Sequence, residues 1–231
     1  DRDKSVQWQA MRLADAHPMV KSAGWVIFFD WDEDLCLEDG MRSFGDLIDT
    51  VPSDTDAVAL PWRLFGAGGQ EELADALTPR RFRLAAPHPF FLPAGSFFKT
   101  LFRPDAFQKL GVHRPRNKGK GPGKWNLAGN GPASDSFAAT EDRINLFGLL
   151  DGPPRARLNH YSLRSAGEFM VKRGRGLPNR TTKAIDLHYW AERNFNIVAD
   201  DAIDPMLDAT DAALAELRAL PGVEETFQAA L

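Results

Sequence analysis

Residues 25–34 read WVIFFDWDED, an apolar run that ends abruptly in acidic residues. The run is short, rich in aromatic and β-branched residues, and preceded by Gly24. It predicts a strand buried on both faces, as in a parallel α/β sheet. Asp30 and Asp32 follow at the carboxyl end of that strand, where α/β sheets bind their ligands. This stretch therefore predicts an α/β fold with a polar site at one edge of the sheet.

The two aspartates have the chemistry of ligands for a divalent cation. Hard cations such as Mg²⁺ or Mn²⁺ take oxygen ligands, often one or two carboxylates together with phosphate oxygens. Acidic residues crowded behind an apolar strand repel one another, and a cation relieves that repulsion. A solvated acidic turn is the alternative interpretation, because a three-residue pattern is weak by itself.

Outward from this stretch, the chain alternates between helical and strand-like patterns. Helices are expected at residues 5–16, 41–50, 166–173 and 205–220, and further strands at 57–62, 97–102 and 157–161. Ser165 and Glu168 have the spacing of a capping box, which marks the start of the third helix. Residues 112–131 are rich in Gly, Pro, Lys and Asn and predict a mobile loop. We expect a mixed, mainly parallel sheet flanked by helices, with a helical C-terminal extension over residues 182–231 that packs on it.

Charge is distributed unevenly along the 231 residues. The net charge is −4, yet residues 99–125 and residues 155–183 each carry +7. Basic islands in an otherwise acidic chain suggest an anionic ligand, although runs of this kind also form solvated faces. The acidic remainder argues against a nucleic-acid partner.

Features of membrane insertion and export are missing from the sequence. No apolar run approaches the roughly 18 residues of a membrane span, and the polar start is not followed by the core of a signal peptide. The single cysteine, Cys36, has no partner for an internal disulfide. We expect a cytoplasmic protein without a transmembrane segment, and peripheral attachment to a membrane stays open.

Several motifs occur in the order shown by bacterial family 2-like glycosyltransferases of the GT-A fold. They are QAM at 9–11, AGWVIFFDWDE at 23–33, LPWRLFG at 60–66, FKTLFRP at 98–104, VHRP at 112–115, LNHYSLRS at 158–165, EF at 168–169 and KRGRG at 172–176. The chain resembles that family over about residues 5–180. The shared order is more specific than any one motif.

The resemblance implies a partial GT-A domain over residues 1–181. It also implies transfer of a sugar from a nucleoside-diphosphate sugar to a hydroxyl of a glycan or lipid-linked acceptor, in polysaccharide or surface-glycan assembly. The implied ligands of Mn²⁺ or Mg²⁺ are Asp30, Asp32 and His160. The implied donor-diphosphate residues are Lys172, Arg173, Arg175 and Lys99. The implied sugar and acceptor pocket contains Trp62, Arg63 and His113.

The chain departs from the family in two ways. The family has two or more nucleotide-binding strand–helix units before Asp-x-Asp, each of roughly 30 residues, so the resemblance implies an N-terminally incomplete chain. Many relatives have Glu-Arg-Phe where this chain has Arg80-Arg81-Phe82. A carboxylate general base is therefore left unassigned, as are the donor sugar and the nucleotide.

Two other hypotheses fit the same residues. A phosphatase of the haloacid-dehalogenase type would use Asp30 as nucleophile and Asp32 as general acid. That family expects Gly-Thr after the second aspartate, whereas Glu33 and Asp34 follow here. A non-catalytic protein would bind anionic glycans through the two basic islands.

Overall fold

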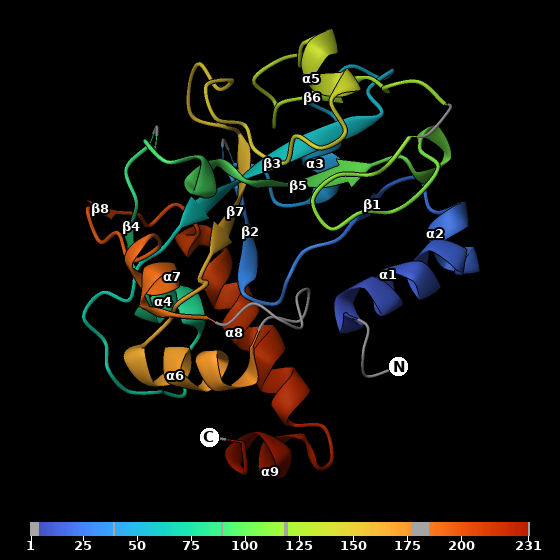
Figure 1. Cartoon of the computed structure of the whole chain (residues 1–231). Coiled ribbons are helices and arrows are strands. Elements are labelled where there is room, and N and C mark those ends of the chain that lie inside the picture. Colours follow the sequence, from blue (N-terminus) through green and yellow to red (C-terminus); the bar gives the residue numbers. More distant parts are fainter. Residues whose placement is uncertain (1–4, 39, 89, 118–119, 177–184, 231) are drawn as a thin grey trace.

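A computed structural model describes residues 5–38, 40–88, 90–117, 120–176 and 185–230. It shows a curled mixed sheet flanked by helices (Figure 1). The strands are β1 (Val26–Ile27), β2 (Glu33–Leu37), β3 (Ala57–Leu64), β4 (Leu84–Ala85), β5 (Phe98–Phe102), β6 (Trp125–Asn126), β7 (Ala156–His160) and β8 (Val198–Ala199). The helices are α1 (Val6–Ala16), α2 (Pro18–Ser22), α3 (Phe44–Ile48), α4 (Thr78–Arg81), α5 (Asp135–Ala139), α6 (Ala166–Arg175), α7 (Leu187–Ala191), α8 (Asp204–Arg218) and α9 (Val223–Gln228), with 3₁₀ turns η1 (Pro93–Ser96) and η2 (Pro104–Ala106).

Strand β3 is the central strand of the main sheet. The strand order is β1-β5-β3-β7-β2, and β6 also pairs with β3. The first part of β3 pairs with β5 and β6, and its last three residues pair with β7. Pro61, which has no N–H to donate, lies just before the residues that pair with β7, in keeping with the confinement of proline to irregular points of a sheet.

The prediction of a mainly parallel sheet is wrong. Within the described part of the main sheet, β1–β5, β3–β5 and β2–β7 are antiparallel, and only β6 and β7 run parallel to β3. The sequence pattern did not predict β2, because EDLCL begins with two acidic residues. This strand pairs with β7 in the antiparallel direction, so it adds an antiparallel pair to the sheet.

The run at residues 25–29 is not a doubly buried strand. Only Val26 and Ile27 form β1, which lies at the edge of the sheet and is half-buried, and Phe29 is exposed. An apolar run indicates affinity for a core but not how many neighbours cover it. Asp30 therefore lies in the turn between β1 and β2, where its carbonyl accepts from the Glu33 amide at 3.0 Å.

The helical predictions are confirmed with shifted ends. Helix α3 is shorter than residues 41–50, whereas α6 continues past residue 173 to Arg175. The capping box at the start of α6 is present: the Ser165 hydroxyl accepts from the Glu168 amide, and the Glu168 carboxylate accepts from the Ser165 amide. Lys172 and Arg175 therefore lie three residues apart on one helical face.

The segment predicted as a loop at residues 112–131 is largely packed where it is described. Trp125 and Leu127 are buried in one cluster with Phe98 and Phe137. Trp125 and Asn126 also form β6. These two apolar side chains, together with the buried Arg114 and Asn117, fix a segment that is otherwise rich in Gly, Pro and Lys.

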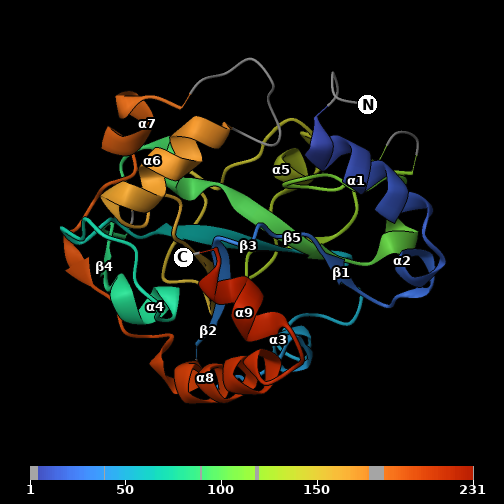
Figure 2. The same ribbon diagram turned by 90° about the horizontal axis from the view of Figure 1, so that it is seen from below.

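Part of the C-terminal segment packs against the strands. Strand β8 pairs with β4, and Ile203 and Leu207 bury themselves against Cys36 of β2. Figure 1 shows α8 below β2, with α9 farther from the sheet, and Figure 2 shows α1 and α2 on the side of β1. The predicted boundary at residues 181 and 182 lies outside the described residues. Across the described ranges, no helix is both long and apolar enough to cross a membrane.

Candidate functional site

Asp32 and His160 meet through the pairing of β2 with β7. Asp32 immediately precedes β2, His160 ends β7, and the register places Glu33 opposite His160. The Asp32 carbonyl accepts from the Tyr161 amide at 2.8 Å. As a result, His160 Nε2 lies 3.7 Å from Asp32 Oδ1.

The protonation states of this pair suit a cation. Burial lowers the pKa of His160 to about 3, despite the opposing pull of Asp32, so its imidazole is neutral at pH 7. Burial alone would raise the pKa of Asp32, but His160 and Lys172 together lower it to about 2. Because His160 is neutral at pH 7, Lys172 and Arg164 are the cations that keep Asp32 ionised there. A neutral imidazole and a carboxylate are the forms that coordinate metals.

Cationic side chains surround Asp32. Lys172 Nζ donates to Asp32 Oδ2 at 2.9 Å and to the Ser162 carbonyl at 2.7 Å. The guanidinium groups of Arg164 and Arg175 lie 5.6 Å and 5.7 Å from the ring centroid of the exposed Trp31. Arg164 has a φ of 59°, an uncommon value for a residue with a side chain, so the backbone turns sharply here.

A cavity of about 320 Å³ opens beside these groups. Its walls include Trp31, Asp32, Arg164, Lys172 and Arg175. The wall contains three cations, Arg164, Lys172 and Arg175, and two carboxylates, Asp32 and Glu168, so this space keeps an excess of positive charge, which suits a phosphate group. Arg173, the fourth residue predicted on the same helix, is exposed and is not among the residues that line this cavity.

Asp30 is held by a different set of residues. Lys99 Nζ is fully buried and lies 2.9 Å from Asp30 Oδ2 and 3.6 Å from Glu33 Oε1. Gln7 of α1 donates to Asp30 Oδ1 at 3.0 Å, and the Asp30 amide donates to Glu33 Oε2 at 2.9 Å. Lys99 thus ties the acidic turn to β5, and it is not one of the residues around the cavity next to Lys172.

The predicted metal ligands therefore divide between two places. Asp32 and His160 come together, whereas Asp30 is bound by Lys99 and Gln7. Within the described residues, no three His, Cys, Asp or Glu side chains are grouped closely enough to hold a metal ion. Burial raises the pKa of Glu33 to about 8, despite the nearby Lys99 ammonium, so Glu33 is mostly protonated at pH 7.

Trp62 lies next to both His160 and His113, and Arg63 points away. The Trp62 ring centroid is 4.1 Å from that of His160 and 5.4 Å from that of His113. Burial and the nearby Lys99 lower the pKa of His113 to about 4. Successive strand side chains alternate between faces, and Arg63 Nε accordingly binds Asp200 at 3.0 Å on the other face of β3.

Three residues of this site were not assigned from the sequence: Trp31, Glu33 and Arg164. The sequence does carry signals for two of them. Trp31 lies between two aspartates, and Glu33 is an acidic residue at turn spacing from Asp30. Arg164 has no comparable signal, because its place depends on the turn that follows β7.

Comparison with models of known protein families finds no match, and comparison with curated proteins finds none either.

Proposed function

We propose that this chain is the cation-binding and acceptor-side part of a GT-A-like, metal-dependent glycosyltransferase that uses a nucleoside-diphosphate sugar. The observation that carries the proposal is the contact between Asp32 and His160, in which Asp32 lies in the wall of a cavity that Lys172 and Arg175 also line.

The donor atoms of this pair fit Mn²⁺ or Mg²⁺. Asp32 supplies a carboxylate oxygen and His160 a neutral nitrogen. Such cations often bind through one or two protein side chains, with substrate phosphates and water completing the shell. A two-residue group is therefore compatible with a cation that is shared with the donor. When bound, the cation supplies Lewis-acid stabilisation of the departing diphosphate.

The cationic side chains beside Asp32 would bind the diphosphate of the donor. Lys172 and Arg175 face the space beside Asp32, where they would neutralise the charge that develops on the diphosphate leaving group. Trp62, with His113 beside it, would contribute an aromatic surface for a glycan or lipid-linked acceptor. Arg63 takes no part, since its guanidinium is bound to Asp200.

Cation binding in the presence of pyrophosphate tests this proposal without knowledge of the nucleotide. The wild-type chain should bind Mn²⁺ more tightly with pyrophosphate than without it, and Asp32→Asn should weaken that binding by at least about tenfold. Asp151→Asn, at an exposed position, is the matched control. Equal Mn²⁺ binding by wild type and Asp32→Asn, or no binding by the folded wild type, would contradict the proposal. Mn²⁺-dependent hydrolysis of nucleoside-diphosphate sugars then identifies the donor.

The two other hypotheses predict different outcomes. Turnover of a chromogenic phosphate ester with Mg²⁺, lost in Asp30→Asn, would favour a phosphatase. A folded chain that binds anionic glycans but not Mn²⁺ would favour the non-catalytic protein.

A further inference from the structure

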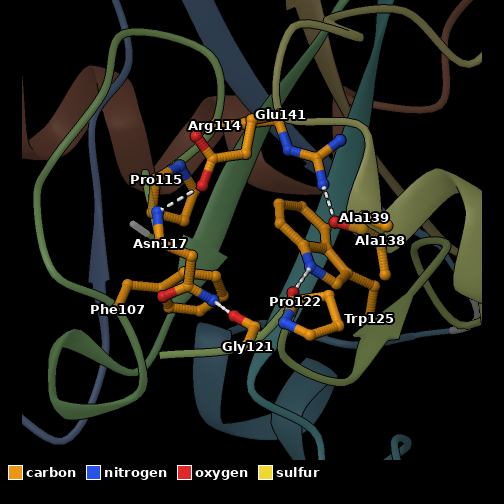
Figure 3. A pocket seen from close by; sticks show the side chains of 10 residues that line it. All are labelled: Phe107, Arg114, Pro115, Asn117, Gly121, Pro122, Trp125, Ala138, Ala139 and Glu141. Carbon is orange, nitrogen blue, oxygen red and sulfur yellow. Dashed lines mark hydrogen bonds between the residues drawn. The ribbon is translucent and has the colours of Figure 1, made fainter. Parts of the chain in front are cut away.

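A second cavity, of about 280 Å³, lies between β6, α5 and the residues before β6 (Figure 3). Trp125 in its wall pairs with Ala57, the first residue of β3, whereas His160 pairs with Leu64, the last. Seven residues of strand, at about 3.3 Å each, separate the two positions along β3. This cavity is therefore distinct from the candidate site at Asp32.

Arg114 is a buried cation in the wall of this cavity. Its guanidinium carbon lies 4.3 Å from the ring centroid of Trp125 and 4.8 Å from that of Phe137. Its terminal nitrogens donate to the carbonyls of Phe137, Ala138 and Arg143. Its Nε is buried and has no hydrogen-bond partner within the described structure. Buried donors are almost always paired, so a hydrogen-bond acceptor is missing here.

Acceptors line the other side of the same space. Asn117 is 7% exposed, and its Oδ1 is also buried without a described partner. The backbone amide of Asn117 donates to Glu141 Oε1 at 2.6 Å, and its side-chain Nδ2 donates to the Gly121 carbonyl. Figure 3 shows Arg114, Asn117 and Glu141 around one space, with Phe107 and Trp125 as apolar walls.

We propose that this cavity binds one monosaccharide unit, a neutral polyhydroxylated ring. A hydroxyl both donates and accepts, so neighbouring hydroxyls of one ring can serve the donor on Arg114 and the acceptors on Asn117 and Glu141. The opposite charges of Arg114 and Glu141 favour a ligand without net charge. The cavity volume of about 280 Å³ is slightly smaller than the roughly 300 Å³ at which typical ligand pockets begin. The cavity therefore has room for a single ring.

The proposal does not depend on glycosyl transfer. The backbone nevertheless links this cavity to the surroundings of His160, because the ring of His113 lies against Trp62, which packs on His160, while the next residue, Arg114, faces Trp125. If both proposals hold, this second cavity is a glycan subsite remote from the Asp32–His160 pair.

Titration with methyl glycosides tests the proposal. Methyl glycosides of glucose, galactose, mannose and N-acetylglucosamine are added to the ¹⁵N-labelled chain, and the indole N–H resonance of Trp125 is followed. That N–H donates to the Pro122 carbonyl at 2.8 Å in the cavity wall, so a ligand should shift its resonance. Glu141→Gln keeps the oxygen that holds the Asn117 amide but loses the charge, and it should weaken binding by about tenfold. Asp142→Asn, whose carboxylate is 93% exposed, should leave binding unchanged.

Several results would overturn this inference. They are no shift of the Trp125 resonance with any glycoside, equal affinities of Glu141→Gln and Asp142→Asn, and shifts confined to Trp31 and Trp62. If Glu141→Gln does not fold, Asn117→Ala removes the other acceptor and is held to the same criterion. Asp32→Asn should retain glycoside binding here, which separates failure of this inference from failure of the proposed transfer activity.

Discussion

His160 Nε2 lies 3.7 Å from Asp32 Oδ1, although the two residues are far apart in the sequence. The contact is created by the antiparallel register of β2 and β7, in which Glu33 lies opposite His160. Trp62 packs on the imidazole from β3.

Loss of the imidazole should weaken cation binding. His160→Gln removes one of two donors, and we expect Mn²⁺ affinity in the presence of pyrophosphate to fall by at least about tenfold, since even indirect partners of metal ligands contribute that much. His88→Gln, at an exposed position, is the control. Electron paramagnetic resonance of free Mn²⁺ gives both affinities, and equal values would show that His160 is not a ligand.

Lys172 and Arg173 should behave differently although they are neighbours on α6. Lys172 is bound to Asp32, whereas Arg173 is exposed. Lys172→Met should weaken pyrophosphate binding by about tenfold in the presence of Mn²⁺, because a charged hydrogen-bond donor is lost. Arg173→Met should change it little. Calorimetry on both variants makes the comparison, and the reverse order would place the diphosphate on the outer face of α6.

Asp200 should be important for stability. Its carboxylate binds Arg63 Nε at 3.0 Å and an Arg157 terminal nitrogen at 2.7 Å, and all three side chains are nearly buried. Asp200→Ala leaves two buried guanidinium groups without this partner, so we expect a loss of about 3–5 kcal/mol in the free energy of unfolding. The exposed Asp201→Ala should stay within about 0.5 kcal/mol of wild type. Urea denaturation measures both, and similar values would contradict the prediction.

Glu33 should make stability depend on pH. Burial raises its pKa from 4.5 to about 8 in the folded chain. Its contribution to stability is therefore full below the unfolded pKa near 4.5 and is lost as the pH rises through about 8. Glu33→Gln removes this loss, so the stability of the variant relative to wild type should increase across that range, by several kcal/mol at most because one pKa unit is worth about 1.4 kcal/mol.

Urea denaturation of Glu33→Gln and wild type on either side of that range tests the prediction. A difference between the two proteins that does not change with pH would mean that Glu33 ionises normally in the folded state.

Local sequence patterns determined several elements of this protein by themselves. Ser165 and Glu168 defined the start of α6, because a capping box satisfies backbone donors within four residues. The apolar runs at β3, β5 and β7 predicted strands with small errors at their ends. The acidic turn after residue 29 pointed to the region of the candidate site.

The tertiary structure alone decided how those elements combine. It turned β1 into an antiparallel edge strand, placed Lys99 on Asp30, brought His160 to Asp32, and directed Arg63 to Asp200. Each of these outcomes depends on which strands become neighbours and in which register. Short-range periodicity carries no information about register between distant strands, whereas a shift of one residue would move every side chain to the opposite face.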